Sequence, residues 1–189
     1  CFSLIVLVIF SLGMGTVYSK ENNNAAIEKM KILNLFSEEM LLADANKAVT
    51  REQLAYTAAG LLGTRNGMVT VNEFTDVSAN SAYAQAIYQL VSEKIMSGAE
   101  NQKFNPKEEV NIDHAIKAMV QILGYQSAAE AKGGYPSGYR VVAMDLGLYR
   151  GLSLNIQNAF TIGDLIKLVD TVLDTEVANS EYYLEGESM

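Results

Sequence analysis

The sequence predicts an all-α fold built from three similar helix-loop-helix units. Three segments, 49–63, 110–124 and 160–174, align without gaps, and the same columns are apolar in each. Those columns recur at i, i+1, i+4, i+7 and i+8, which is one face of an α-helix. No unit of this size can bury its apolar face alone, so we expect the three to pack together as a pseudo-threefold bundle.

The aligned columns predict the buried face of the second helix in each unit. In chain order they are Leu54, Ala115 and Leu165; Ala55, Ile116 and Ile166; Ala58, Met119 and Val169; Leu61, Ile122 and Val172; and Leu62, Leu123 and Leu173. Thr50, Asn111 and Thr161 precede the helices and offer side-chain oxygens as caps. Gly63 and Gly124 are predicted to end two of them in the left-handed conformation.

A shorter amphipathic helix precedes each of these segments. Its apolar positions are Ala26, Ile27, Met30 and Leu33 in the first unit, Ala86, Ile87, Leu90 and Val91 in the second, and Val142, Ala143 and Leu146 in the third. Each ends at a turn residue, which is Asn34, Lys94 or Gly147, followed by an apolar pair. Asn and Gly suit a left-handed turn, whereas Lys94 predicts a strained one.

The chain is predicted to begin with a targeting segment. Residues 1–19 carry no charge and contain an apolar run, which is typical of a secretory signal peptide, here truncated at its N-terminus and cleaved after Ser19. The alternative is a retained anchor helix, but a membrane span needs about 20 apolar residues. We expect membrane contact only through this segment.

The three units are predicted at 20–65, 72–126 and 127–177, and 178–189 is predicted to be a linker to a further C-terminal region.

Composition excludes several classes of function. The net charge is −8, and a nucleic-acid binder needs a basic surface. The only cysteine, Cys1, lies in the predicted signal peptide, so a disulfide framework or thiolate metal site is not expected in the mature chain. His114 is the only histidine, and we favour a solvent or packing role over a metal ligand. No catalytic motif is recognisable, so we expect neither an enzyme nor a cofactor.

The second unit resembles a known repeat from end to end. Its matching residues are Phe74-Thr-Asp-Val77, Ala86-Ile87, Leu90, Ile95-Met-Ser-Gly98, Phe104-Asn-Pro106 and the helix to Gly124. In order and spacing they resemble an S-layer homology (SLH) repeat. In the first unit, Val49-Thr-Arg-Glu52 resembles the T-R-A-E motif of that family, and 142–151 with Phe160-Thr161 resembles a more divergent third copy. The resemblance covers about 25–177.

The resemblance implies a bundle of three SLH repeats that binds secondary cell-wall polysaccharide, including pyruvylated forms, in grooves between the repeats. It also implies that a secreted bacterial protein is held non-covalently at the cell wall or surface layer. Family members use the T-R-A-E arginine and a glycine-rich loop for this binding. Here Thr50 and Arg51 match the motif, whereas the second and third copies have Ile112 and Ile162 in place of the arginine.

Five residues are the candidates for glycan contact, namely Thr50, Arg51, Glu52, Gly98 and Tyr135. The guanidinium of Arg51 can fork onto a carboxylate or a ketal-linked pyruvate. The alternative is a surface ion pair with Glu52. Gly98 keeps the first glycine of the family's loop. Tyr135 could stack on a sugar ring, although we favour a connecting-loop tyrosine that packs on a neighbour.

Two other functions stay open at this stage. Degenerate SLH repeats without glycan binding would act as a structural or protein-interaction scaffold, which the missing arginines favour. Alternatively, the segment is the targeting arm of a wall-active hydrolase.

Overall fold

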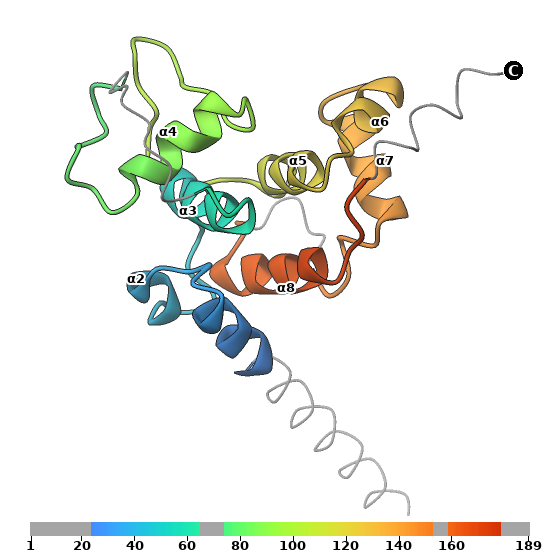
Figure 1. Ribbon diagram of the computed structural model, residues 1–189, viewed down its shortest axis with the longest axis horizontal. Helices are drawn as coiled ribbons and strands as arrows, with labels where there is room; N and C mark the ends of the chain where they lie inside the picture. The colour runs from blue at the N-terminus through green and yellow to red at the C-terminus, as the bar shows by residue number, and fades with distance from the viewer. Residues whose placement is uncertain (1–23, 65–73, 153–158, 179–189) are drawn as a thin grey trace, which may run out of the picture.

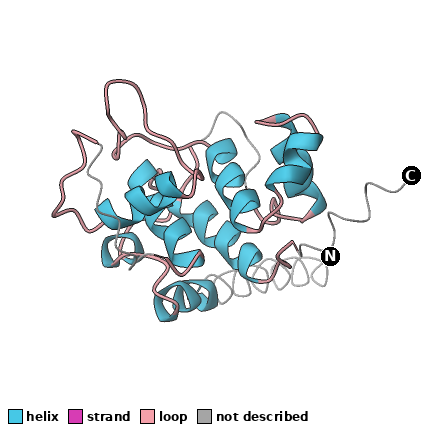
Figure 2. Ribbon diagram, turned by 45° about the horizontal axis from the view of Figure 1, so that its top comes forward, coloured by secondary structure: helices cyan, strands magenta, loops and turns pink. Residues whose placement is uncertain are grey.

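A computed structural model describes residues 24–64, 74–152 and 159–178, and helices dominate these ranges. Residues 24–32 are helical. The helices that follow are α2 (Glu38–Leu41), α3 (Arg51–Leu61), α4 (Ala84–Ser92), α5 (Ile112–Ile122), α6 (Gln126–Ala131), α7 (Ser137–Asp145) and α8 (Ile162–Leu173). Figure 2 shows only helices and loops in the described part of the chain. The all-α prediction is confirmed, whereas the predicted signal peptide at 1–19 lies outside the described residues.

Three helices, α3, α5 and α8, surround the centre of the molecule, and the remaining helices lie outside them (Figure 1). The first three predicted apolar columns are buried in every unit, at Leu54, Ala55, Ala58, Ala115, Ile116, Met119, Leu165, Ile166 and Val169. The last two columns are only partly right, since Leu61, Leu62 and Ile122 are partly buried. Leu123 is buried, but Leu173 is 37% exposed because α8 ends there.

The caps at the start of α5 and α8 agree with the prediction. The side-chain oxygen of Asn111 accepts from the N–H of His114 at 3.0 Å. The hydroxyl of Thr161 accepts from the N–H of Asp164 at 3.2 Å, and the Asp164 carboxylate accepts from the N–H of Thr161 at 3.2 Å. Such reciprocal bonds satisfy N–H groups that have no partner within the helix.

The turn after the first helix has the same hydrogen bond in all three units. The N–H groups of Leu35, Ile95 and Leu148 donate to the carbonyl oxygens of Met30, Leu90 and Ala143, at 2.8, 2.9 and 2.8 Å. The turn residues Asn34, Lys94 and Gly147 have φ angles of 51°, 59° and 71°. The strained turn predicted at Lys94 is therefore confirmed. The prediction that Leu33 lies on the buried face of the first helix is wrong, since this residue is 51% exposed.

The first helix of each unit packs on the second helix of the preceding unit. Helix α4 packs on α3, and α7 packs on α5. Helical residues 24–32 pack on α8, where Lys29 pairs with Asp170 at 2.7 Å and Ile27 and Met30 share an apolar cavity with Ile162. This last contact joins the beginning of the described chain to its end, so the units form a closed ring (Figure 1).

Two short helices were not predicted. Helix α2 lies in the loop of the first unit, and α6 packs on α7 in the third. The approach of α6 and α7 needs a glycine, because a Cβ on Gly138 would overlap the carbonyl oxygen of Ala129. Close approach of two backbones is a common reason for glycine inside an element. Helix α6 also sets the position of the loop that carries Tyr135.

Candidate functional site

The start of α3 is held against the loop that joins α4 to α5. The N–H of Arg51 donates to the carbonyl oxygen of Glu108 at 2.9 Å, and that of Glu52 donates to Pro106 at 3.0 Å. Thr50 precedes the helix with an extended backbone. The N–H groups of a first helical turn need acceptors outside the helix. The predicted site residues Thr50, Arg51 and Glu52 therefore lie at a junction between two units.

The side chain of Arg51 reaches across this junction. Its Nε donates to the carbonyl oxygen of Phe104 at 2.9 Å and its Nη2 donates to that of Ser97 at 2.7 Å. The guanidinium carbon lies 4.5 Å from the centre of the Phe104 ring. Burial lowers the pKa of Arg51, while Glu108 and Asp76 oppose that shift. The salt bridges among the described residues do not include Arg51, and its guanidinium is positioned by two carbonyl oxygens and a ring face.

One interpretation of the sequence expected an ion pair between Arg51 and Glu52. The structure shows Glu52 paired with Lys107 instead. Glu52 is 4% exposed, and its carboxylate accepts from the ammonium of Lys107 at 2.5 Å. A buried carboxylate needs such a partner. Glu52 therefore holds the loop of the second unit to α3, and its burial removes it from the surface that a glycan could reach.

Gly98 follows Ser97, which accepts a hydrogen bond from Arg51, and it packs against Phe74. A Cβ at this position would overlap the ring of Phe74. That ring is buried and lies 5.5 Å from the ring of Phe104 and 6.1 Å from that of Tyr88. Because these rings are packed together, Phe74 has little room to move away. Gly98 thus shapes the loop that surrounds the Arg51 side chain.

Tyr135 lies against the first turns of α5. Its ring is nearly parallel to that of His114, at 10° and 6.3 Å between centroids, and the Nζ of Lys117 lies 5.6 Å from the ring centre. The rings of Tyr135 and Tyr139 meet edge to face, with 6.2 Å between their centroids. Tyr135 therefore packs on a neighbour, as the favoured interpretation expected, but 45% of its surface stays exposed.

Charged side chains missed by the sequence analysis surround this tyrosine. Arg140 forks onto Asp113, with Nε 2.7 Å from Oδ1 and Nη2 2.5 Å from Oδ2. Desolvation lowers the pKa of His114 and the charge of Arg51 adds to this effect. The imidazole therefore lies within electrostatic reach of the guanidinium. The spacing of His114 and Lys117, three residues apart on one helix, could have shown that both share a face.

The helix α4 and the loop that holds the Arg51 side chain belong to one continuous segment. Residues 73–111 match the S-layer homology domain. This SLH segment contains α4 and both residues that accept hydrogen bonds from the Arg51 side chain, Ser97 and Phe104. The match lies within the predicted second unit and supports the resemblance found there.

Curated relatives are bacterial surface proteins. The chain is 27% identical over 135 residues, 70% of its length, to a middle cell wall protein of Brevibacillus brevis. It is 26% identical over 148 residues, 76% of its length, to a cell surface protein of Thermoanaerobacter kivui. A surface layer protein of Brevibacillus choshinensis is 22% identical over 142 residues, 74% of the chain.

The aligned regions are small parts of these relatives, covering 12%, 18% and 12% of their lengths, respectively.

Asp76 fixes the loop of the SLH segment. Its two carboxylate oxygens accept from the N–H groups of Phe104 and Asn105, each at 2.8 Å. Desolvation would raise the pKa of Asp76, but these N–H groups and Lys103 together lower it below its ordinary value of 3.8. Phe104 is thereby held under the guanidinium of Arg51 by a residue of the same segment.

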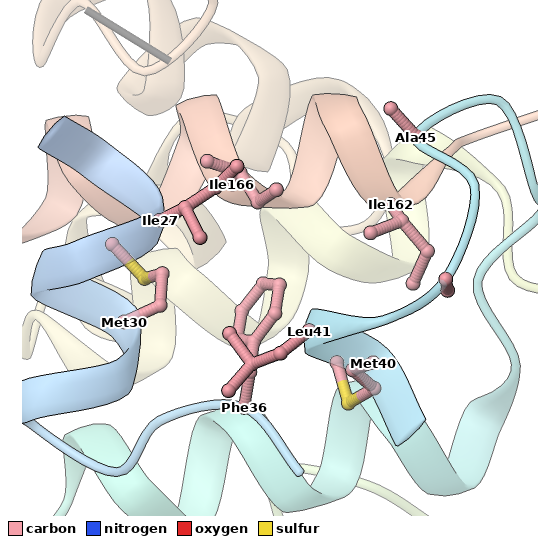
Figure 3. A pocket seen from close by; sticks show the side chains of 9 residues that line it. Ile27, Met30, Phe36, Met40, Leu41, Ala45, Ile162 and Ile166 are labelled. Carbon is pink, nitrogen blue, oxygen red and sulfur yellow. The ribbon is translucent and has the colours of Figure 1, made fainter. Parts of the chain in front are cut away.

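The start of α8 forms a junction equivalent to that at the start of α3, but the side chains in it are apolar. The N–H of Ile162 donates to the carbonyl oxygen of Lys47 at 2.9 Å, and that of Gly163 donates to the carbonyl oxygen of Ala45 at 2.8 Å. At the start of α3, the N–H groups of Arg51 and the next residue donate in the same pattern. Ile162 is 1% exposed. Ile162 lines an apolar cavity (Figure 3). Ala43 also lines this cavity, and by the register of these hydrogen bonds it corresponds to Phe104.

This cavity holds about 50 Å³, whereas ligand pockets usually hold roughly 300 Å³ or more. This cavity at the α8 junction is therefore too small to hold a sugar. Residues 153–158, which precede α8 in the sequence, lie outside the described residues.

The described ranges contain no group of three or more His, Cys, Asp or Glu side chains placed to hold a metal ion. None of their helices combines the length and apolar character that crossing a membrane requires.

Proposed function

We propose that this chain anchors a secreted bacterial surface protein to the cell wall without a covalent bond, by binding secondary cell-wall polysaccharide. Location at the cell wall or cell surface is supported by the SLH segment and by the names of the three relatives. We further propose that all three units are SLH repeats. Their support is the hydrogen bond shared by the three turns.

The observation that carries this proposal is the arrangement of Arg51. A guanidinium held by two carbonyl oxygens and a ring face keeps its positive charge, and the described salt bridges give it no carboxylate. A planar guanidinium recognises carboxylates well. A glycan carboxylate, such as a pyruvate ketal, would pair directly with this guanidinium.

Sedimentation with cell walls tests this proposal. Purified chain is mixed with sacculi that retain secondary polysaccharide and with sacculi from which it has been extracted. We expect binding only to the first, and a loss of about tenfold or more for Arg51→Ala, since a charge-assisted bond contributes roughly that much.

Because Arg51 also holds a loop, the thermal unfolding of each variant is measured alongside. Lys31→Ala removes one positive charge from an exposed position in the 24–32 helix and is the matched control. Equal sedimentation with both kinds of sacculi would contradict the polysaccharide as ligand.

The second candidate function is a scaffold without glycan binding. The buried Ile162 favours it, because this residue takes the position of the arginine at the α8 junction and fills it with apolar packing. A scaffold would not sediment with either kind of sacculi, although it would be fully folded.

A further inference from the structure

Residues 174–178, which we call the strap, follow α8 and cross to the end of α5 (Figure 1). The strap leaves α8 through a turn in which the N–H of Thr175 donates to the carbonyl oxygen of Val172 at 3.1 Å. At α5, the N–H of Ala178 donates to the carbonyl oxygen of Leu123 at 2.8 Å. The strap therefore joins the ends of two central helices that belong to different units.

Two further contacts hold the strap at the end of α5. A Cβ on Gly124 would lie 3.3 Å from the Cβ of Ala178, so the two backbones approach each other closely. The hydroxyl of Tyr125 donates to the carbonyl oxygen of Glu176 at 3.4 Å. The last carbonyl groups of a helix have no partner within it. Ala178 therefore supplies a donor that the end of α5 needs.

The end of α3 has the same turn as the end of α5. The N–H groups of Thr64 and Tyr125 each donate to the carbonyl oxygen five residues earlier, at 3.1 and 3.0 Å. Gly63 and Gly124 have φ angles of 67° and 85°. Among the described residues, however, a Cβ on Gly63 would meet nothing within 4 Å. The two ends therefore share a turn, and the strap distinguishes them within the described chain.

The strap and Arg51 lie at opposite ends of the central helices. The residues just before α3, α5 and α8 contact one another, since the N–H of Val49 donates to the carbonyl oxygen of Phe160 at 2.9 Å and that of Val110 donates to the carbonyl oxygen of Val49 at 2.9 Å. Arg51 therefore lies where the three helices begin. Helix α5 has 11 residues, so it is roughly 16 Å long. That length separates the strap from the candidate site.

We infer that the strap is a positioning device, which fixes the point where the chain leaves the ring beside the end of α5, on the side away from Arg51. Residues that follow Ala178 then start about one helix length from the side chain that carries the proposed function. A region attached there is directed away from the wall polysaccharide. This last consequence rests on the proposed function, whereas the position of the strap does not.

Paramagnetic labelling of the full chain tests where the strap lies in solution. In a Cys1→Ser background, Val177→Cys carries a nitroxide at a position that is 61% exposed. We expect the label to broaden the amide resonance of Leu123 more strongly than the imidazole resonances of His114, the only histidine, which lies in the first turn of α5. Ala178→Pro removes the N–H donor and should reduce this difference.

Amide hydrogen exchange tests whether the end of α5 holds the strap. Gly124→Ala places a methyl group against Ala178, whereas Gly63→Ala makes the same change where the described residues leave open space. Both variants put alanine at a positive φ and carry a similar backbone strain. Exchange at Ala178 should become about tenfold faster in Gly124→Ala, since a hydrogen bond contributes roughly that much. In Gly63→Ala it should change by about threefold or less, because local opening of the strap is unaffected.

Broadening of the His114 resonances that equals that of Leu123 would overturn the inferred position of the strap. Broadening that is unchanged by Ala178→Pro, or equal exchange at Ala178 in the two glycine variants, would overturn its role as a positioning device. Neither measurement involves a glycan. Failure of these tests therefore leaves the proposed function in place, and failure of sedimentation with sacculi leaves the strap in place.

Discussion

At the scale of one residue, Asp76 shows how a single carboxylate can fix the conformation of a loop. It accepts two backbone N–H groups, from Phe104 and Asn105. Asn105 has a φ of 55° and Gln102 has the same value, so this loop contains left-handed residues that need outside support. The carboxylate supplies it and keeps Phe104 beneath Arg51.

Replacing Asp76 should therefore weaken the fold in a pH-dependent way. Asp76→Asn loses two charge-assisted bonds, and we expect the free energy of unfolding at neutral pH to fall by about 1.5–3 kcal/mol. Because the folded pKa of Asp76 is below 3.8, its contribution is present above that value and is lost as pH falls through the folded pKa. Urea denaturation at neutral pH and near pH 3 measures both effects.

The difference between the native chain and Asp76→Asn should thus shrink in acid. A difference that is the same at both pH values would show that the carboxylate charge is not what holds the loop.

The short turn after the first helix is the informative feature at the scale of an element. Three different residues, Asn34, Lys94 and Gly147, adopt the left-handed conformation there. The sequence predicts this turn because its flanking apolar pairs recur, and it predicts the strain because lysine has a Cβ. Helix α6 could not be predicted in the same way, since Gln126–Ala131 is too short to show a periodic apolar face.

Lys94→Gly should stabilise the protein. Relief of the left-handed strain outweighs the greater entropy that glycine has in the unfolded chain, so we expect a gain of about 0.5–1 kcal/mol in thermal or urea unfolding. The reverse change at the equivalent position, Gly147→Lys, should lose a similar amount. If both variants are less stable than the native chain, the lysine side chain has a favourable contact that outweighs the strain.

The closed ring is the main feature at the scale of the whole molecule. Its last junction joins helical residues 24–32 to α8 through the Lys29–Asp170 pair and through buried Met30. The sequence predicts three units and their buried faces, but it does not predict which helices pair. An apolar face fits any other apolar face of similar width, so the pairing of each first helix with the preceding unit could be read only from the structure.

The candidate site was predictable to the same extent. The motif predicts Arg51 as a candidate, but the sequence does not predict the groups around Tyr135, because they come from helices that only the fold brings together.

Met30→Ala tests the closing junction. Met30 is fully buried, and removing its side chain enlarges an existing cavity, so we expect a loss of about 2–4 kcal/mol in the free energy of unfolding. Leu33→Ala, at an exposed position of the same turn, should change stability by less than about 0.5 kcal/mol. Hydrogen exchange should also speed up in α8 for Met30→Ala, whereas unchanged exchange there would mean that the ring is not closed by this contact.

The packing of each unit on its neighbour has a practical consequence for the choice of fragments to express. A fragment that spans only the SLH segment, 73–111, would contain α4 without α3 on which it packs, and would stop before α5 begins. Such a fragment would expose the apolar faces that these helices normally cover. Residues 73–111 match the family by sequence similarity, but they are unsuitable bounds for an expressed fragment. A single unit cut out of the chain is not expected to be soluble by itself.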